Sequence, residues 1–324
     1  MRLAETRSLI ALASLVVALI NPATDSLSAQ VEVKPIQEGI TQDQFLSDQE
    51  TAPAIEWVSY ELFQPSDREL DSFISPMTNL VYFEDPRALT EIRPFFIHHK
   101  IPLAAGGGSV QMYGAQLRFR LTENISFIAI KDGYATTSSP ILGNGWADIA
   151  AGLKFTLLRD PINQAIFSGG ITYELPTGES SMFQGNGDGD FNIFLAGAQK
   201  LGNRVNWMSA SGVRVPVNST DESMSSFWSN HLDLQVTNNF YALMEFNWYH
   251  WIDSGQDGPI PGIEGLDLIN FGNPGVSGND IVTGAVGCKF KIGGHEAGVA
   301  WELPLTSRED ILDNRLTVDV RLRY

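Results

Sequence analysis

The chain ends on RLTVDVRLRY, from Arg315 to Tyr324, and this stretch decides the fold. Two sets of side chains alternate along it: Leu316, Val318, Val320, Leu322 and Tyr324 on one parity, and Thr317, Asp319, Arg321 and Arg323 on the other. Successive side chains of a β-strand point to opposite faces, so the pattern predicts a strand with one apolar face and one charged face. A chain that closes a barrel must end on such a strand, because the last strand pairs back with the first.

Segments of the same kind recur from about residue 91, and we count roughly twelve. Two examples are YGAQLRFRL at 113–121 and WADIAAGLKFTLL at 146–158. Strands of about 9–11 residues suit a tilted crossing of a lipid bilayer. The sequence therefore predicts an all-β protein built as a transmembrane antiparallel up-and-down barrel of about twelve strands.

The connections between these segments are alternately short and long. The short ones lie at 122–124, 159–163, 202–204, 237–239 and 293–294, and the long ones at 132–145, 177–189, 218–228 and 252–279. An outer-membrane barrel has short periplasmic turns and longer outer loops. A secreted β-sandwich or lipocalin-like barrel is the alternative, but it gives no reason for the alternation.

The first 90 residues divide into two parts. Residues 1–29 have the pattern of a secretory signal peptide, with Arg2 and Arg7 before an apolar run at 8–20 and a cleavage site after Ala29. An uncleaved anchor is the alternative. Residues 30–90 are expected to form an N-terminal periplasmic extension, as a plug in the barrel mouth or as a loosely ordered tail. Residues 91–324 are the expected barrel.

Composition excludes some partners. The formal net charge is −17, and a nucleic-acid partner needs a basic surface, so none is expected. The single cysteine, Cys288, allows no internal disulfide. Acidic residues crowd the long connections, which predicts an acidic outer rim.

Charged residues of both signs fall on the parity opposite to the apolar one. They are the lumen-lining candidates: Arg118, Arg120, Asp148, Lys154, Glu174, Asp233, Glu245, Lys289, Glu302, Asp319, Arg321 and Arg323. Unpaired buried charges are costly, so the two signs are expected to pair and to narrow the lumen.

The sequence offers no convincing catalytic or metal site. GNGDGDF at 185–191 resembles the start of a calcium loop, but Phe191 and Gly197 stand where an EF-hand needs glycine and glutamate. His250 and Ser254 are the candidates for a hydrolytic pair, without a convincing orienting group. We therefore expect no metal, no cofactor and no enzymatic activity.

GGITYELPTGE at 169–179, with DIAAGLKFTLLRD before it and DFNIFLAGAQKL after it, resembles the outer-membrane family named for the meta-pathway of phenol degradation. The resemblance covers Gly145 to Val217. It implies a transporter of small molecules, hydrophobic or aromatic compounds among them, and defines no site residue. Barrels of this kind resemble one another in ending on an aromatic residue, which implies that Tyr324 is read by the barrel assembly machinery.

These observations predict a porin-like channel of the cell outer membrane for passive passage of small solutes. Its expected partners are outer-membrane lipid, the assembly machinery and the solutes themselves. An outer-membrane lipid hydrolase and a structural or adhesive surface barrel are the alternatives.

Overall fold

The alternating segments form strands between Glu91 and Arg323. The structure is a computed structural model that describes residues 63–324, so the expected signal peptide lies outside the described residues. The strands are β1 Glu91–Lys100, β2 Ser109–Arg120, β3 Ile125–Lys131, β4 Tyr134–Thr137, β5 Gly145–Trp146, β6 Ile149–Asp160, β7 Ala165–Leu175, β8 Asp190–Leu201, β9 Val205–Pro216, β10 Met224–Gln235, β11 Phe240–Asp253, β12 Asp280–Ile292, β13 His295–Pro304 and β14 Asn314–Arg323. Two single-turn 3-10 helices, Leu103–Ala105 and Ser180–Met182, lie in the connections.

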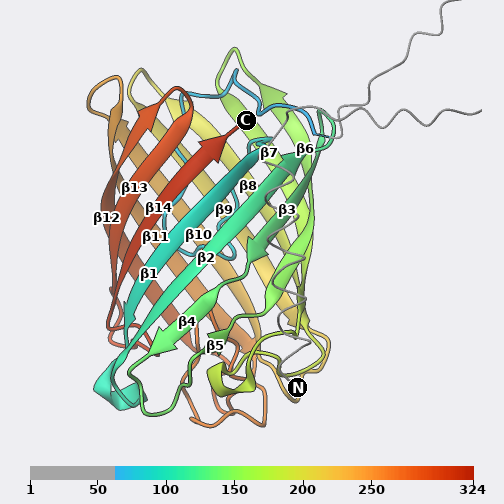
Figure 1. Cartoon of the computed structure of the whole chain (residues 1–324), viewed down its shortest axis with the longest axis vertical. Helices are drawn as coiled ribbons and strands as arrows, with labels where there is room; N and C mark the ends of the chain where they lie inside the picture. The colour runs from blue at the N-terminus through green and yellow to red at the C-terminus, as the bar shows by residue number, and fades with distance from the viewer. Residues whose placement is uncertain (1–62) are drawn as a thin grey trace, which may run out of the picture. The chain divides into compact units, whose positions relative to one another are not determined.

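The strands form one closed antiparallel barrel with twelve strand positions around its wall (Figure 1). At two of these positions, two shorter strands lie end to end. β3 and β4 pair one after the other with β2, on either side of a break at Asp132 and Gly133. β5 pairs with β4 and β6 pairs with β3, on either side of a break at Ala147 and Asp148. The backbone of Ala147 donates to the carbonyl of Gly133 at 2.8 Å, so the two breaks are bridged.

The barrel closes where the last strand meets the first. β14 pairs with β1 from Asn314 opposite Lys100 to Arg323 opposite Glu91. β1 also pairs with β2 along its whole length. β1 and β14 are therefore each paired on both edges, as a barrel needs in a solvent that offers no hydrogen bonds. The twelve-stranded barrel predicted from the sequence is confirmed.

The two rims of the barrel differ as the sequence predicts (Figure 1). The turns of one rim are short, for example 202–204 between β8 and β9, whereas the connection from β11 to β12 runs through 254–279. Two of the expected loops were too long by several residues. Residues 132–145 contain β4 and the start of β5, and β10 begins at Met224 inside the expected loop 218–228.

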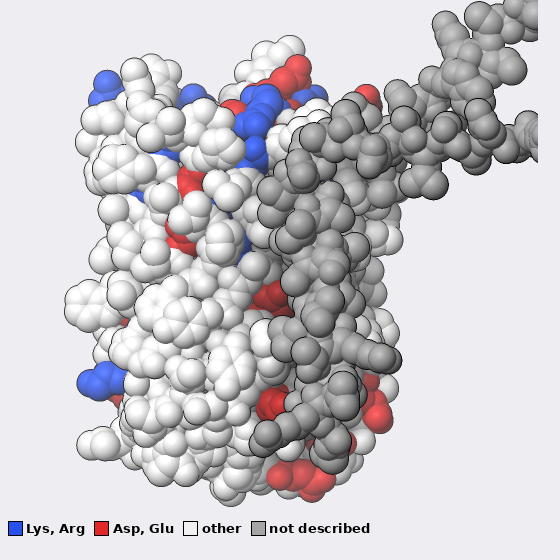
Figure 2. Space-filling view, viewed as in Figure 1, with Lys and Arg blue, Asp and Glu red and all other residues white. Residues whose placement is uncertain are grey.

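On each strand, the apolar set of alternate side chains faces the outside of the barrel. Its exposed large side chains include Leu153, Ile193, Trp228, Val286, Trp301 and Leu322. In the face shown by Figure 2, the described wall is mostly uncharged between the two ends of the barrel. An apolar exterior around a closed hydrogen-bonded sheet is the arrangement of a membrane barrel. Among residues 63–324, no helix is long and apolar enough to cross a membrane.

Candidate functional site

The lumen of the barrel is the candidate site, and it is occupied by the chain itself. We name residues 63–90 the inner segment. Both of its ends lie at the short-turn rim: the amide of Ser66 donates to the carbonyl of Tyr324 at 2.7 Å, and the amide of Tyr324 donates to the carbonyl of Thr90 at 2.9 Å. Between these ends, Leu70, Phe73, Ile74 and Met77 are fully buried.

The inner segment extends from the short-turn rim to the far half of the lumen. Near its middle, Asn79 Nδ2 donates to Ser229 Oγ on β10 at 2.8 Å. Farther along, Tyr82 accepts a hydrogen bond at 2.7 Å from Arg214 of β9, two residues before that strand ends at the long-loop rim. The segment therefore fills the lumen over most of the length of the strands.

Charged side chains of the inner segment pair with charged side chains of the wall. Arg118 on β2 donates from Nε and Nη2 to Glu84 at 2.9 and 2.6 Å. Lys154 on β6 donates to Glu84 at 2.8 Å and to the carbonyl of Arg87 at 2.8 Å. Arg87 in turn donates to Asp85 at 2.7 and 3.0 Å. These five side chains are buried, so each charge depends on its partners.

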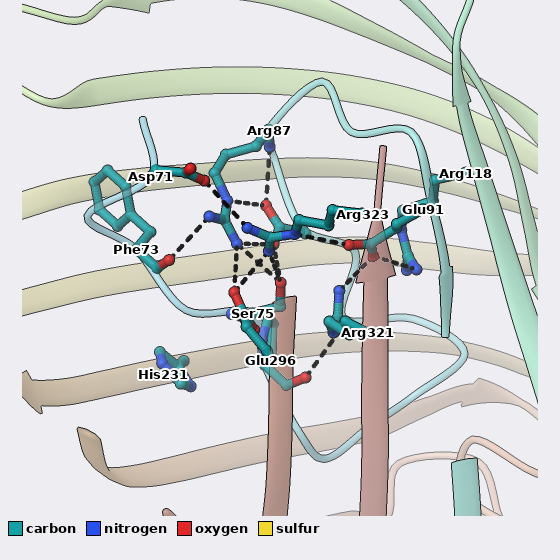
Figure 3. A network of polar contacts seen from close by, with 12 residues as sticks. Asp71, Phe73, Ser75, Arg87, Glu91, Arg118, His231, Glu296, Arg321 and Arg323 are labelled. Carbon is teal, nitrogen blue, oxygen red and sulfur yellow. Dashed lines mark hydrogen bonds and ion pairs between the residues drawn. The ribbon is translucent and has the colours of Figure 1, made fainter. Parts of the chain in front are cut away.

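A second group of charges joins β1, β13 and β14 (Figure 3). Glu91 accepts from Arg321 at 2.7 Å and from Arg323 at 3.0 Å. Arg323 also donates to Glu296 at 2.7 Å, and Glu296 accepts from the amide of Ser75 in the inner segment at 3.1 Å. The final strand is thus connected to the inner segment through its two arginines.

Three further charged side chains belong to this group. Asp319 accepts from Arg93 Nε at 2.8 Å and from Lys289 Nζ at 3.1 Å. Arg93 also donates from Nη2 to the carbonyl of Pro76 at 3.0 Å. The backbone of the inner segment therefore also accepts hydrogen bonds from side chains of the barrel wall.

Glu245 on β11 anchors the middle of the inner segment. Its carboxylate accepts from the amides of Met77 and Thr78, each at 2.7 Å, and from the hydroxyl of Thr78. On its other side lies His231 of β10, whose Nδ1 is 2.7 Å from Glu245 and whose Nε2 is 3.2 Å from Asp233. All of these groups are buried.

The long-loop end of the lumen has its own polar contacts. Lys131 pairs with Glu174. Asp148 accepts from the amides of Gly178 and Gly185 at 2.7 and 2.9 Å. Glu302 accepts from Thr283 at 2.6 Å and from Asn247 at 3.0 Å.

Several buried polar atoms near this end have no hydrogen-bond partner among the described residues. They are Asp190 Oδ2, both side-chain polar atoms of Asn192, and Nε and Nη2 of Arg214. Asn192 and Arg214 are direct cross-strand neighbours on β8 and β9. Polar atoms buried in this way normally bind water or a ligand.

The structure brings together eleven of the twelve candidates taken from the sequence. Those eleven are buried inward: Arg118, Asp148, Lys154, Glu174, Asp233, Glu245, Lys289, Glu302, Asp319, Arg321 and Arg323. Arg120 differs, because it lies at the short-turn rim, is partly exposed and donates to the carbonyl of Pro65 at 3.2 Å.

The sequence analysis missed the partners that the inner segment supplies. Glu84, Asp85 and Arg87 lie within EDPR at 84–87, directly before the first strand. A signal was present, because a compact charged group next to the barrel sequence can neutralise inward charges that need partners. Arg93 was missed because Pro94 interrupts the alternation of β1.

His250 and Ser254, the candidates for a hydrolytic pair that the sequence did not favour, are not hydrogen-bonded to each other. Ser254 Oγ accepts instead from the amides of Val276 and Ser277 at 3.0 and 2.8 Å. Among residues 63–324, no group of three or more His, Cys, Asp or Glu side chains is placed to hold a metal ion.

The acidic outer rim is less exposed than the sequence predicts. Glu222, Glu264, Asp267 and Asp310 are buried, because the long loops fold back over the end of the lumen. Glu264 accepts from Ser223 Oγ at 2.7 Å and from the amide of Asn273 at 2.9 Å, which fixes two of these loops to each other. Some of the acidic residues of the long loops therefore stabilise the folded loops instead of forming a charged surface.

Comparisons with known proteins find similar solved structures but no family. No protein-family model and no curated protein sequence matches the chain. The fold is similar to the KdgM porin, at 10% identity over 72% of this chain and 99% of that one, with a TM-score of 0.41. It is also similar to the translocator domain of the autotransporter NalP from Neisseria meningitidis, at 9% identity over 72% and 88%, with a TM-score of 0.44.

A third similar structure is Wzi of Escherichia coli, an outer-membrane protein involved in capsule assembly, at 11% identity over 78% of this chain and 66% of that one, with a TM-score of 0.35. This chain is a closed twelve-stranded β-barrel of the transmembrane type. The likeness is one of architecture alone, so no substrate or activity is transferred from these proteins. The phenol-degradation family suggested by the sequence stays a hypothesis.

Proposed function

We propose that this outer-membrane barrel is a channel for passive passage of small solutes, and that the inner segment closes it in the conformation described. The observation that carries the proposal is the position of residues 63–90 in the lumen. The segment makes hydrogen bonds and ion pairs with wall residues on several strands, for example with Arg118, Lys154 and Glu245. Solutes pass when this segment is displaced.

The chemistry of these contacts supports a reversible closure. Most of the contacts between the inner segment and the charged wall residues are ionic or involve backbone groups. Charged groups that leave such pairs regain their hydration in a water-filled lumen, which offsets part of the lost attraction. Both ends of the segment lie at the short-turn rim, so it can leave the lumen on one side without being threaded through the barrel.

Two separate arguments, one from the structure and one from the sequence, indicate the chemical class of the solute. The amide of Asn192, which makes no hydrogen bond among the described residues, and Arg214, whose Nε is 3.8 Å from Asp190 Oδ2 and makes no hydrogen bond, favour solutes that accept and donate hydrogen bonds near the long-loop end. The sequence resemblance to the phenol-degradation family favours hydrophobic or aromatic solutes. Small aromatic molecules that carry hydroxyl groups satisfy both.

Single-channel conductance in planar bilayers tests the proposal. We expect a low basal conductance for the full chain and a large, steady conductance for a variant that lacks residues 63–89. The matched control is Asp313→Ala, which removes an exposed carboxylate paired with Lys100 at 2.8 Å and should conduct like the unchanged protein. A deletion variant that inserts as a folded barrel and remains silent would contradict the channel.

The occupied lumen also favours a second candidate, a structural or adhesive surface barrel. In that case the inner segment is a permanent part of the interior. The full chain would then stay silent at all voltages and solute concentrations, while only the deletion variant would conduct. Occasional openings of the full chain distinguish the channel from this alternative.

A further inference from the structure

Three polar residues lie side by side on the outer wall of the barrel, apart from the lumen. Ser226 of β10 is the direct cross-strand partner of His250 on β11, and His250 is the direct partner of Asp280 on β12. All three are at least partly exposed. A serine, a histidine and a carboxylate in this order are the groups that nucleophilic acyl transfer needs.

The histidine is already oriented by the carboxylate. His250 Nδ1 is 2.9 Å from Asp280 Oδ1. The imidazole also stacks on Trp248, with ring centroids 5.6 Å apart, and Trp248 Nε1 donates to the same Asp280 oxygen at 2.8 Å. A carboxylate at Nδ1 fixes the tautomer in which Nε2 is free to accept a proton.

Ser226 lies on the opposite side of His250 from Asp280. Directly opposed residues of an antiparallel pair have Cβ atoms about 4.5–5.5 Å apart, so rotation of two side chains can bring a hydroxyl to an imidazole. Among residues 63–324, no hydrogen bond engages the hydroxyl of Ser226, whereas that of Ser209 is held by Trp228 Nε1 at 2.9 Å. Hydrogen bonds of this type are often long until substrate binds.

The depth of the three residues matches the position of lipid ester groups. Ser226 is the third residue of β10, His250 is three residues before the end of β11, and Asp280 is the first residue of β12. All three therefore lie at the long-loop end of their strands, at the membrane–water interface. Trp228 and Trp248 lie in the next row, as interfacial aromatic residues do.

A groove adjoins this row on the lipid-facing side. It has a volume of about 480 Å³ and is lined by Trp228, Asn230, Phe246, Trp248 and Val282, together with the backbone of β11. Small-molecule sites commonly have volumes of roughly 300–1,000 Å³. Trp228 and Trp248 are one row below Ser226 and His250, so an acyl chain in the groove would place its ester carbonyl at the row of polar residues.

We propose that the outer wall carries an ester-hydrolysing site for lipids of the outer leaflet. Ser226 is the nucleophile, His250 is the general base and acid, and Asp280 is a positioning residue. This activity is independent of the lumen. It departs from the expectation, drawn from the sequence, that the chain is not an enzyme.

The reaction proceeds in two balanced halves. Ser226 Oγ bonds to the ester carbonyl carbon while its proton passes to His250 Nε2. The adduct collapses with cleavage of the bond to the alcohol oxygen, and the alcohol leaves with that proton. Water then attacks the acyl-serine and gives a proton to Nε2, which returns it to Ser226 as the fatty acid leaves.

Turnover should be slow. The indole N–H groups of Trp228 and Trp248 are already donated to Ser209 and Asp280, so interfacial water must solvate the oxyanion. A dedicated oxyanion donor contributes about 100- to 1,000-fold to kcat. Covalent labelling of the serine is therefore a necessary companion to a turnover assay.

The test uses the full-length protein in mixed micelles of neutral detergent and dipalmitoyl phosphatidylcholine. Fatty-acid release is measured, and a fluorophosphonate label is mapped to its peptide by mass spectrometry. We expect release by the unchanged protein and a label on Ser226. Ser226→Ala and His250→Ala should each lower the rate by about 100-fold or more.

Two serines serve as controls. Ser211→Ala removes an exposed wall serine on β9, and Ser254→Ala removes the loop hydroxyl near His250; both should keep the rate within about twofold of the unchanged protein. Asp280→Asn should lower the rate, and Asp280→Glu should restore most of it, because the carboxylate is what orients the imidazole.

Retention of heat-modifiable gel migration shows that each variant is folded. No fatty-acid release by the unchanged protein, or full release by Ser226→Ala, overturns the proposal. Neither result bears on conductance through the lumen, so the two proposals fail separately.

Discussion

At the scale of the residue, Glu245 shows how one buried carboxylate connects the wall to the inner segment. It accepts hydrogen bonds from two backbone amides and one hydroxyl of the inner segment and faces His231 on its other side. Each of these groups was removed from water on folding. The carboxylate is therefore the shared acceptor of a cluster that has no access to solvent.

Replacing Glu245 with Ala should lower the free energy of unfolding by about 3–5 kcal/mol, the cost of breaking a buried charge cluster on one side. The reason is that His231 and the amides of Met77 and Thr78 would lose their acceptor. Urea titration followed by tryptophan fluorescence measures the change. Asp313→Ala, at an exposed pair, should cost no more than about 1 kcal/mol. Equal stability of the two variants would show that Glu245 does not anchor the segment.

Glu222 gives the outer loops a dependence on pH. It lies in the connection from β9 to β10, and burial, followed by the nearby charge of Asp190, raises its pKa from its usual value of 4.5 to about 8. In the loop connecting β13 and β14, burial likewise raises the pKa of Asp310 to about 7. The folded loops therefore hold protons that the unfolded chain has already lost.

Because the folded state binds more protons between about pH 4.5 and pH 8, the stability of the folded loops should fall as the pH rises through that window. Hydrogen exchange of residues 217–223 should accordingly be faster at pH 9 than at pH 5, after correction for intrinsic exchange. Glu222→Gln, which stays neutral, should remove most of that difference. An unchanged pH response in this variant would assign the effect to other groups.

At the scale of the element, the final strand can be tested for its contribution to the stability of the barrel and for its role in assembly. Val320 faces outward on β14 and is 39% exposed, whereas Tyr324 follows the strand at the short-turn rim. A charged side chain on the lipid face costs about 2–4 kcal/mol at the midplane and about 0–1 kcal/mol near the interface. Val320→Arg should therefore destabilise the folded barrel more than Tyr324→Asp.

The amount of protein assembled in the outer membrane should fall more for Tyr324→Asp than for Val320→Arg. Tyr324→Asp, or deletion of Tyr324, should lower the amount of assembled protein by more than its small stability cost explains, if the assembly machinery reads the terminal aromatic. Quantitative blotting of outer-membrane fractions beside urea titration separates the two effects. Wild-type assembly of both Tyr324 variants would rule out the recognition role.

The elements also show what the sequence could and could not predict. The strands were predictable because the alternation of Leu316, Val318 and Val320 with Thr317 and Asp319 is a local property. The inward direction of Lys154 and Glu245 followed from the same parity. The break at Asp132 was missed because a strand interrupted by Gly133 looks like a loop, and the break at Ala147 was missed because the alternation of WADIAAGLKFTLL continues through it.

The contents of the lumen depend on long-range pairs that no local period encodes. Met77 meets Glu245, which is 168 residues away in the chain, and Glu84 meets Arg118 and Lys154, which lie on different strands. The inner segment has the mixed charge and the prolines of a flexible tail when it is read alone. Its buried arrangement can be predicted only when the positions of the charges in the closed barrel around it are known.

At the scale of the whole molecule, the asymmetry of the two rims predicts the orientation in the membrane. The connections 176–189 and 254–279 lie at the long-loop rim, while 202–204 and both ends of the inner segment lie at the short-turn rim. A closed barrel keeps the two rims on opposite sides of the bilayer. Short turns belong on the periplasmic side and long loops on the outside.

A protease-cleavage tag inserted after Asp257, or at 181–189, should be cut on intact cells, and a tag at 202–204 should be protected until the outer membrane is permeabilised. The chosen sites are suitable because Asp257, Ser181 and Asn203 are all exposed, so an insertion there disturbs little packing. Heat-modifiable migration of each tagged protein checks that the barrel has formed. Protection at 254–279 together with cleavage at 202–204 would invert the orientation, and the proposed ester-hydrolysing site would then face the inner leaflet. Cleavage of all three tags on intact cells would mean that the strands do not seal the membrane, and the barrel would lose its assignment as a transmembrane protein.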